Sequence, residues 1–198
     1  MFDLSAIEQG VKDAIAALNR PYIAEVKTYG GEFDDDLGLD QVVQRFPAVW
    51  VTFSGGGAPK PIGAKKWHMP LTFTVLVGAR SLRNEESARH GVTVDGRLVD
   101  VGSFQLLGDV ARALAGQTFG LSINQMQPGK ITTIFNTKTR NEAVSVLAMD
   151  WSTYVYIEMF DAEEECAEWL DQINLNYMFK PGDDVADVTD QIVLGGGS

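Results

Sequence analysis

The segment that most constrains the fold is a nearly continuous apolar run, residues 48–53, followed directly by Ser-Gly-Gly-Gly at 54–57. Its β-branched and aromatic residues favour a strand, and its lack of polar residues predicts a central strand with little solvent on either face. A second strand is predicted over residues 67–79, where alternate positions are apolar: Leu71, Phe73, Val75 and Val77. The two strands predict an antiparallel hairpin joined by a long basic loop, residues 58–66.

Three amphipathic helices are predicted around this hairpin. Ser5 and Glu8 have the spacing of a capping box, so the first helix is expected to begin at Ser5. Acidic residues 34–36 followed by apolar residues at helical spacing predict a short second helix that ends before Pro47. The third ends at Gly116, and its core-facing residues are predicted to be Phe104, Leu107, Val110, Ala111 and Leu114.

Further strands are predicted at residues 22–29, 121–127, 131–135 and 143–157, the last with a bulge near Asp150. The sequence therefore predicts an α+β fold: a mostly antiparallel sheet with amphipathic helices packed on it, long hairpin loops and a C-terminal arm.

The domain organisation is predicted to be one core domain with an appendage. The core spans residues 1–160 and includes a peripheral insertion, residues 80–101, with a turn of helix and a tight hairpin at Asp95-Gly96. Residues 161–198 form an acidic C-terminal arm, whose stretch from Asp161 to Asn176 is predicted to be helical.

Charge and cysteine content exclude several classes of protein. The 198 residues include 16 basic and 27 acidic ones, a net charge of −11, which disfavours sequence-independent binding of nucleic-acid phosphates over the whole surface. The single cysteine, Cys166, allows no internal disulfide, which favours a reducing compartment. We also expect no secretion signal and no membrane-spanning segment.

No group of residues has the spacing of a known catalytic, metal or cofactor site. Gly55-Gly56-Gly57 lacks the Lys-Ser/Thr pair of a phosphate loop, and Ser54 lacks the glycine that precedes a nucleophile elbow. His68 and His90 are too far apart for a paired metal motif, and Glu32 with residues 34–36 does not have calcium-loop spacing. Acidic neighbours raise the pKa expected for a thiol such as that of Cys166. We therefore expect no enzyme activity, no metal and no cofactor.

One local reversal of charge stands out in this acidic chain. Basic residues flank Trp67 on the predicted hairpin loop, and more follow in the insertion; the candidate assembly-interface residues are Lys60, Lys65, Lys66, Trp67, Arg80 and Arg83. The cluster predicts a surface complementary to an acidic partner, and a solvated loop is the alternative.

The block Tyr29-Gly30-Gly31-Glu32-Phe33-Asp34, followed by Phe46-Pro47-Ala48-Val49-Trp50-Val51-Thr52-Phe53-Ser54-Gly55, resembles a family of Mu-like bacteriophage and prophage morphogenesis proteins associated with tail termination. In outline the resemblance covers residues 1–160. It implies a small α+β protein that forms a ring of six at the head-proximal end of a tail tube, stops tube growth and joins the tail to the neck.

The partners implied are further copies of the chain, the tail tube protein and a neck or connector protein, with the tail sheath as a further candidate. DNA would pass through the ring without specific binding, and no membrane is involved. The expected location is the tail or neck of the virion, after assembly in the cytoplasm of the host bacterium. The alternatives are another head–tail connector, or a tail-assembly chaperone or binding module that does not stay in the virion.

Overall fold

The computed structural model describes residues 2–31, 42–139, 142–159, 172–177 and 188–193. Contacts divide the chain into two compact units, Met1–Ile157 and Glu158–Ser198, and each is described by itself. This division into units does not test the predicted domains. The core domain, residues 1–160 with its insertion, and the arm, residues 161–198, remain predictions.

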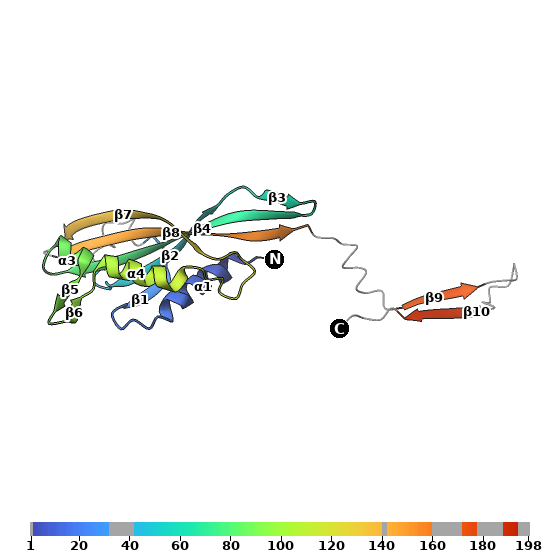
Figure 1. Cartoon of the computed structure of the whole chain (residues 1–198), viewed down its shortest axis with the longest axis horizontal. Helices are drawn as coiled ribbons and strands as arrows, with labels where there is room; N and C mark the ends of the chain where they lie inside the picture. The colour runs from blue at the N-terminus through green and yellow to red at the C-terminus, as the bar shows by residue number, and fades with distance from the viewer. Residues whose placement is uncertain (1, 32–41, 140–141, 160–171, 178–187, 194–198) are drawn as a thin grey trace. The chain divides into compact units, whose positions relative to one another are not determined.

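Unit 1 is built on a six-stranded sheet with the order β1-β2-β4-β8-β7, in which β3 pairs with β4 (Figure 1). The strands are β1 (Glu25–Thr28), β2 (Ala48–Gly56), β3 (Lys60–Gly63), β4 (Lys66–Ser81), β7 (Gln127–Thr139) and β8 (Glu142–Glu158). β1 is parallel to β2, whereas β2 and β3 are antiparallel to β4 and β7 is antiparallel to β8. The predicted α+β class with a mostly antiparallel sheet is confirmed.

Helices α1 (Leu4–Ala16) and α4 (Ser103–Leu114) pack on one face of this sheet. α1 lies against β1 and β2, and α4 lies against β4. The residues of β4 predicted to share a face are all buried in the common core: Leu71, Phe73, Val75 and Val77. Burial of this many large side chains is the main stabilising term for unit 1, because each contributes roughly 1.5–3 kcal/mol.

The ends and faces of the helices differ from prediction in two places. The N-cap of α1 is Asp3, whose carboxylate accepts hydrogen bonds from the backbone N–H groups of Ser5 and Ala6, so the predicted cap at Ser5 is wrong by two residues. In α4 the buried stripe includes Leu106, whereas Phe104 is 47% exposed and lies edge-on to His90. α4 therefore presents a face to the core that is rotated from the predicted one.

The opposite face of the sheet carries a second apolar cluster. Val42, Val43 and Phe46 are buried there against Trp50 and neighbouring residues of β4 and β8. Val42 and Val43 have helical backbone, in agreement with the predicted second helix, whose beginning lies outside the described residues. Since Ala48–Val51 of β2 are covered on both faces, the predicted central strand is confirmed.

Several strand predictions need correction. β2 continues through Gly56 with a bulge between Phe53 and Gly55, and the predicted loop 58–66 contains β3. The predicted strand 22–29 shortens to β1, and residues 121–127 form only an isolated bridge, from Ile123 to Val155, before β7 begins. The bulge predicted near Asp150 is present, but the extra residue lies on the opposing strand β7.

The insertion contains α3 (Glu85–His90), β5 (Val92–Val94) and β6 (Arg97–Asp100), as the predicted turn of helix and tight hairpin. Asp95 and Gly96 both have positive φ, which is the geometry of a two-residue hairpin turn. A Cβ on Gly102 would lie 2.2 Å from the carbonyl oxygen of Arg89, so this glycine allows the end of α3 to lie against the start of α4.

Unit 2 contains a two-stranded antiparallel sheet of β9 (Gln172–Tyr177) and β10 (Val188–Val193). The helix predicted from Asp161 to Asn176 is therefore wrong over Gln172–Asn176, where apolar residues recur at every second position, the period of a strand. Residues 161–171 lie outside the described residues.

Candidate assembly surface

The six residues predicted as an assembly interface separate into two groups. Lys60 begins β3, Lys65 lies in the turn, and Lys66 and Trp67 begin β4, so the β3–β4 pairing brings these four together. Arg80 lies near the other end of β4 and Arg83 just beyond it. The rise of an extended strand places Arg80 about 45 Å from Lys66. The structure therefore contains two surfaces where the sequence predicted one.

The first surface, called the hairpin end here, comprises β3, residues 66–70 of β4 and residues 154–157 of β8. It extends past the helices that cover the rest of the sheet (Figure 1). All four residues of β3 are exposed, as is Tyr156. A sheet without a helix over it presents side chains on both faces, as an interaction surface does.

A ladder of rings crosses the hairpin end between β4 and β8. The His68 and Tyr154 ring centres are 5.5 Å apart, and those of Tyr154 and Tyr156 are 5.8 Å apart. The Nζ atom of Lys66 lies 5.1 Å from the centre of the Tyr156 ring. The basic cluster predicted from the sequence is thus joined to an aromatic row, which the sequence analysis missed because its two strands are about 90 residues apart in the chain.

A row of polar side chains lies where the ladder meets the second apolar cluster. Ser54 and Thr74 share a hydrogen bond of 2.6 Å between their hydroxyl oxygens, and Thr74 donates to Asp150 at 2.6 Å. These residues come from β2, β4 and β8, so the row ties three strands together at the root of the hairpin end. Ser54 therefore forms a contact between β2 and β4.

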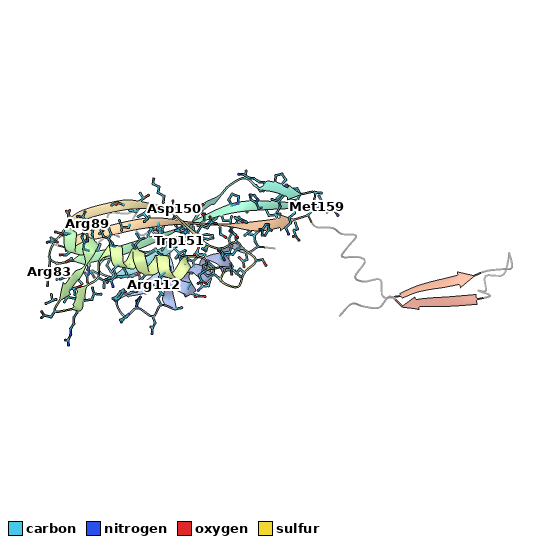
Figure 2. The ribbon with its side chains drawn as sticks, in the orientation of Figure 1. Arg83, Arg89, Arg112, Asp150, Trp151 and Met159 are labelled. Atoms are coloured by element: carbon cyan, nitrogen blue, oxygen red, sulfur yellow. The ribbon has the colours of Figure 1, made fainter. Side chains whose placement is uncertain are left out.

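The second surface, called the insertion end here, comprises residues 80–104. Figure 2 shows Arg83 and Arg89 at this end of unit 1. Five large apolar residues are exposed here: Leu82, Val94, Leu98, Val99 and Phe104. The sequence analysis treated this stretch as merely peripheral, although a three-residue strand paired with a four-residue one is too small to bury its own apolar residues.

A partly buried polar cluster joins the segment after α1 to α4. Arg20 donates to Asp109 Oδ1 through Nη2 at 3.0 Å and Nε at 3.2 Å, and the Tyr22 hydroxyl donates to Asp109 Oδ2. Burial raises the pKa of the Tyr22 phenol above its ordinary value of 10.0, and the hydrogen bond to Asp109 raises that pKa further. The cluster is a tertiary contact across 87 residues of sequence, and no local pattern indicated it.

Among the residues that the structure describes, the remaining candidates do not assemble into a chemical site. Gly55 and Gly56 lie within β2, away from any helix N-terminus, and His68 and His90 both contact aromatic rings at different ends of unit 1. Within the described ranges no three histidine, cysteine or acidic side chains gather as a metal site would require, and no helix has the length and apolar character needed to cross a membrane. Glu32, residues 34–36 and Cys166 lie outside the described residues.

A family model described as bacteriophage Mu, Gp37 matches residues 3–156. The chain belongs to the Gp37 family of bacteriophage Mu. The resemblance to Mu-like phage proteins is thereby confirmed at the level of the family, and the match covers nearly all of unit 1 while ending before β9. No curated protein matches the chain. Both exposed ends of unit 1 therefore lie within the part of the chain that defines this Gp37 family member.

Proposed function

We propose that this Gp37 family member is a tail terminator, a structural virion protein that forms a ring of six at the head-proximal end of the tail tube. The ring stops polymerisation of the tube and joins the tail to the neck. The partners are further copies of the chain, the tail tube protein and a neck or connector protein, with the tail sheath as a further candidate.

The observation that carries this proposal is the pair of different exposed surfaces at opposite ends of β4. A closed ring requires each copy to contact its two neighbours through two different surfaces, and a joint between tube and neck likewise requires two. The hairpin end offers cations and aromatic rings, and the insertion end offers exposed apolar residues beside Arg83 and Arg89. Both ends extend beyond the buried core of unit 1, to which Val155 of the hairpin end and Val101 of the insertion end belong.

The distribution of charge supports passage of DNA through such a ring without binding. Residues 1–157 contain 16 acidic and 15 basic residues, a net charge of −1, and residues 158–198 contain 11 acidic and 1 basic, a net charge of −10. The acidic character therefore belongs almost wholly to unit 2. Acidic segments facing the lumen would repel phosphate as the DNA passes.

The proposal is tested by adding the purified chain to growing tail tubes and measuring tube length by electron microscopy. A terminator shortens the tubes and leaves a ring at one end, and the protein is present in purified virions. Unchanged tube length together with absence from virions would overturn the proposal in favour of a non-virion chaperone or binding module. A ring at the neck without any effect on tube growth would indicate another connector.

A further inference from the structure

Strand β7 is an open edge of the unit 1 sheet. It is the last strand in the sheet order, and β8 is its strand partner among the described strands. Residues 131–134 are all exposed, with Ile131 at 52% and Ile134 at 45%. Its pairing with β8 has two register irregularities, one between Pro128 and Ile131 and one between Thr133 and Phe135, and the exposed residues include both sides of the first and one side of the second. Exposed, uncharged edge strands offer unpaired backbone groups to another strand.

The opposite edge of the sheet, β1, is protected from pairing with a further strand, in contrast to β7. β1 has four residues, and two of them, Glu25 and Lys27, form an ion pair at 2.6 Å. Its last residue, Thr28, is hydrogen-bonded to Lys12 and Glu8 of α1. Short length, charge and a covering helix are the usual protections of an edge, whereas β7 has seven consecutive uncharged residues, 131–137.

Unit 2 supplies a strand pair that is too small to be stable alone. β9 and β10 have six residues each, and an isolated two-stranded ribbon is marginally stable in water. The register pairs Ile173 with Ile192, Leu175 with Asp190 and Tyr177 with Val188. Pairing with the edge strand of a larger sheet would therefore stabilise the ribbon.

Charge favours unit 2 as the source of added strands, and the reach of the chain allows them to come from a second copy. β7 contains Lys130 and Lys138 and no acidic residue, and unit 2 carries the net charge of −10 derived above. Fourteen residues, 158–171, precede β9. A chain of this length spans up to about 48 Å when extended, which is enough to reach a neighbouring subunit.

We infer that β7 is the acceptor for the β9–β10 ribbon of a second copy of this chain, which extends the unit 1 sheet by strand addition. Main-chain hydrogen bonds supply the affinity, and the lysines at either end of the uncharged run favour the acidic segments that precede β9 and join it to β10. This inference deepens the proposed terminator function, because exchange of ribbons around a ring links each subunit to the next.

The test uses the full-length chain in a Cys166→Ser background, with cysteines placed on the acceptor and donor strands. One tagged chain carries Thr133→Cys on β7, a differently tagged chain carries Thr189→Cys on β10, and a short bis-maleimide cross-linker is added to their mixture. We expect a cross-linked product that contains both tags. A matched control with Leu82→Cys, which is 77% exposed at the insertion end, should give no such product.

Two outcomes would overturn the inference. The first is the absence of the mixed product. The second is cross-linking confined within single chains when both cysteines are placed on one chain, since this would mean that the ribbon binds its own β7. Rings that form without the mixed product would support the terminator function and reject the ribbon exchange. The mixed product without any ring would support the ribbon exchange and reject the terminator function.

A second pair of variants tests the edge itself. Ile131→Lys with Ile134→Lys should reduce the mixed product at least about tenfold, since added charge on an edge opposes strand addition. Ile131→Val with Ile134→Val keeps the β-branched apolar character and should retain the product. Both variants should unfold at nearly the wild-type temperature, because both positions are exposed. An unchanged yield from the lysine variant would contradict β7 as the acceptor.

Discussion

The Nζ atom of Lys66 lies 5.1 Å from the centre of the Tyr156 ring, so β4 and β8 present a cation and an aromatic ring together at the hairpin end. Because the pair lies at the surface, the contact contributes about 0.5–1 kcal/mol to folding. Tyr156→Ala should therefore lower the free energy of unfolding by no more than about 1.5 kcal/mol while weakening ring assembly. Denaturant titration and sedimentation separate the two effects, and normal assembly by a folded variant would remove this surface from the account.

Replacing residues 60–65 by a tight Asn-Gly turn should leave unit 1 folded, because all of these residues are exposed. Assembly should weaken, since the replacement removes Lys60, Lys65 and the exposed strand β3. Circular dichroism monitors folding, and tube-length measurement monitors assembly. A cooperative loss of folding would show that the hairpin end supports the core.

Trp50 is the largest side chain in the second apolar cluster, and its ring centre is 5.6 Å from that of Phe46. Trp50→Ala should lower the free energy of unfolding by about 3–5 kcal/mol, because the removed ring leaves a cavity in a central strand. Phe53→Ala, in the same strand but partly exposed, should cost clearly less. Equal losses for the two variants in urea unfolding would contradict the central placement of residues 48–51.

Phe46 also explains a glycine in the middle of β4. A Cβ on Gly78 would lie 2.6 Å from Cζ of Phe46, so Gly78→Ala should destabilise unit 1 by about 1–3 kcal/mol. Gly108→Ala is the matched control, since a Cβ there meets no neighbouring atom and alanine favours the helix by about 0.5–1 kcal/mol. The two alanines should shift the thermal midpoint in opposite directions, and shifts of the same sign would contradict the packing of Phe46 on β4.

The raised pKa of Tyr22 gives a pH dependence with a definite sign. The folded state holds the phenol proton more tightly than the unfolded state, so the stabilisation is fully present below the ordinary value of 10.0 and is lost as pH rises through the folded pKa. Above about pH 10 the unfolding free energy of the wild type should fall more steeply than that of Tyr22→Phe. Parallel curves for the two proteins would mean that the contact with Asp109 does not hold the proton.

The elements with a strong local period were predictable from the sequence. The alternation from Leu71 to Val77 specifies a strand because a period of two is the period of a strand, and the β-branched and aromatic residues of the apolar run 48–53 favour a buried strand. Pairing of β1 with β2, burial of Leu106 in place of Phe104, and the short strand β3 depend on tertiary neighbours. Local propensity is a weak guide where packing decides.

The candidate surface was predictable only in part for the same reason. The lysines at 60, 65 and 66 form a cluster in the sequence, and the hairpin keeps them close. Arg80 follows Lys66 by 14 residues in the same strand, so it lies far from the lysines in space although it is near them in the sequence. Tyr156 reaches Lys66 through a strand pairing, which a single sequence does not reveal.

The most direct test of the terminator account is the mass of the purified full-length chain, measured by sedimentation over a wide range of concentrations. The account predicts a discrete species of about six subunits that persists on dilution, as a closed ring does. A monomer at every concentration, or an open series of growing oligomers, would contradict it.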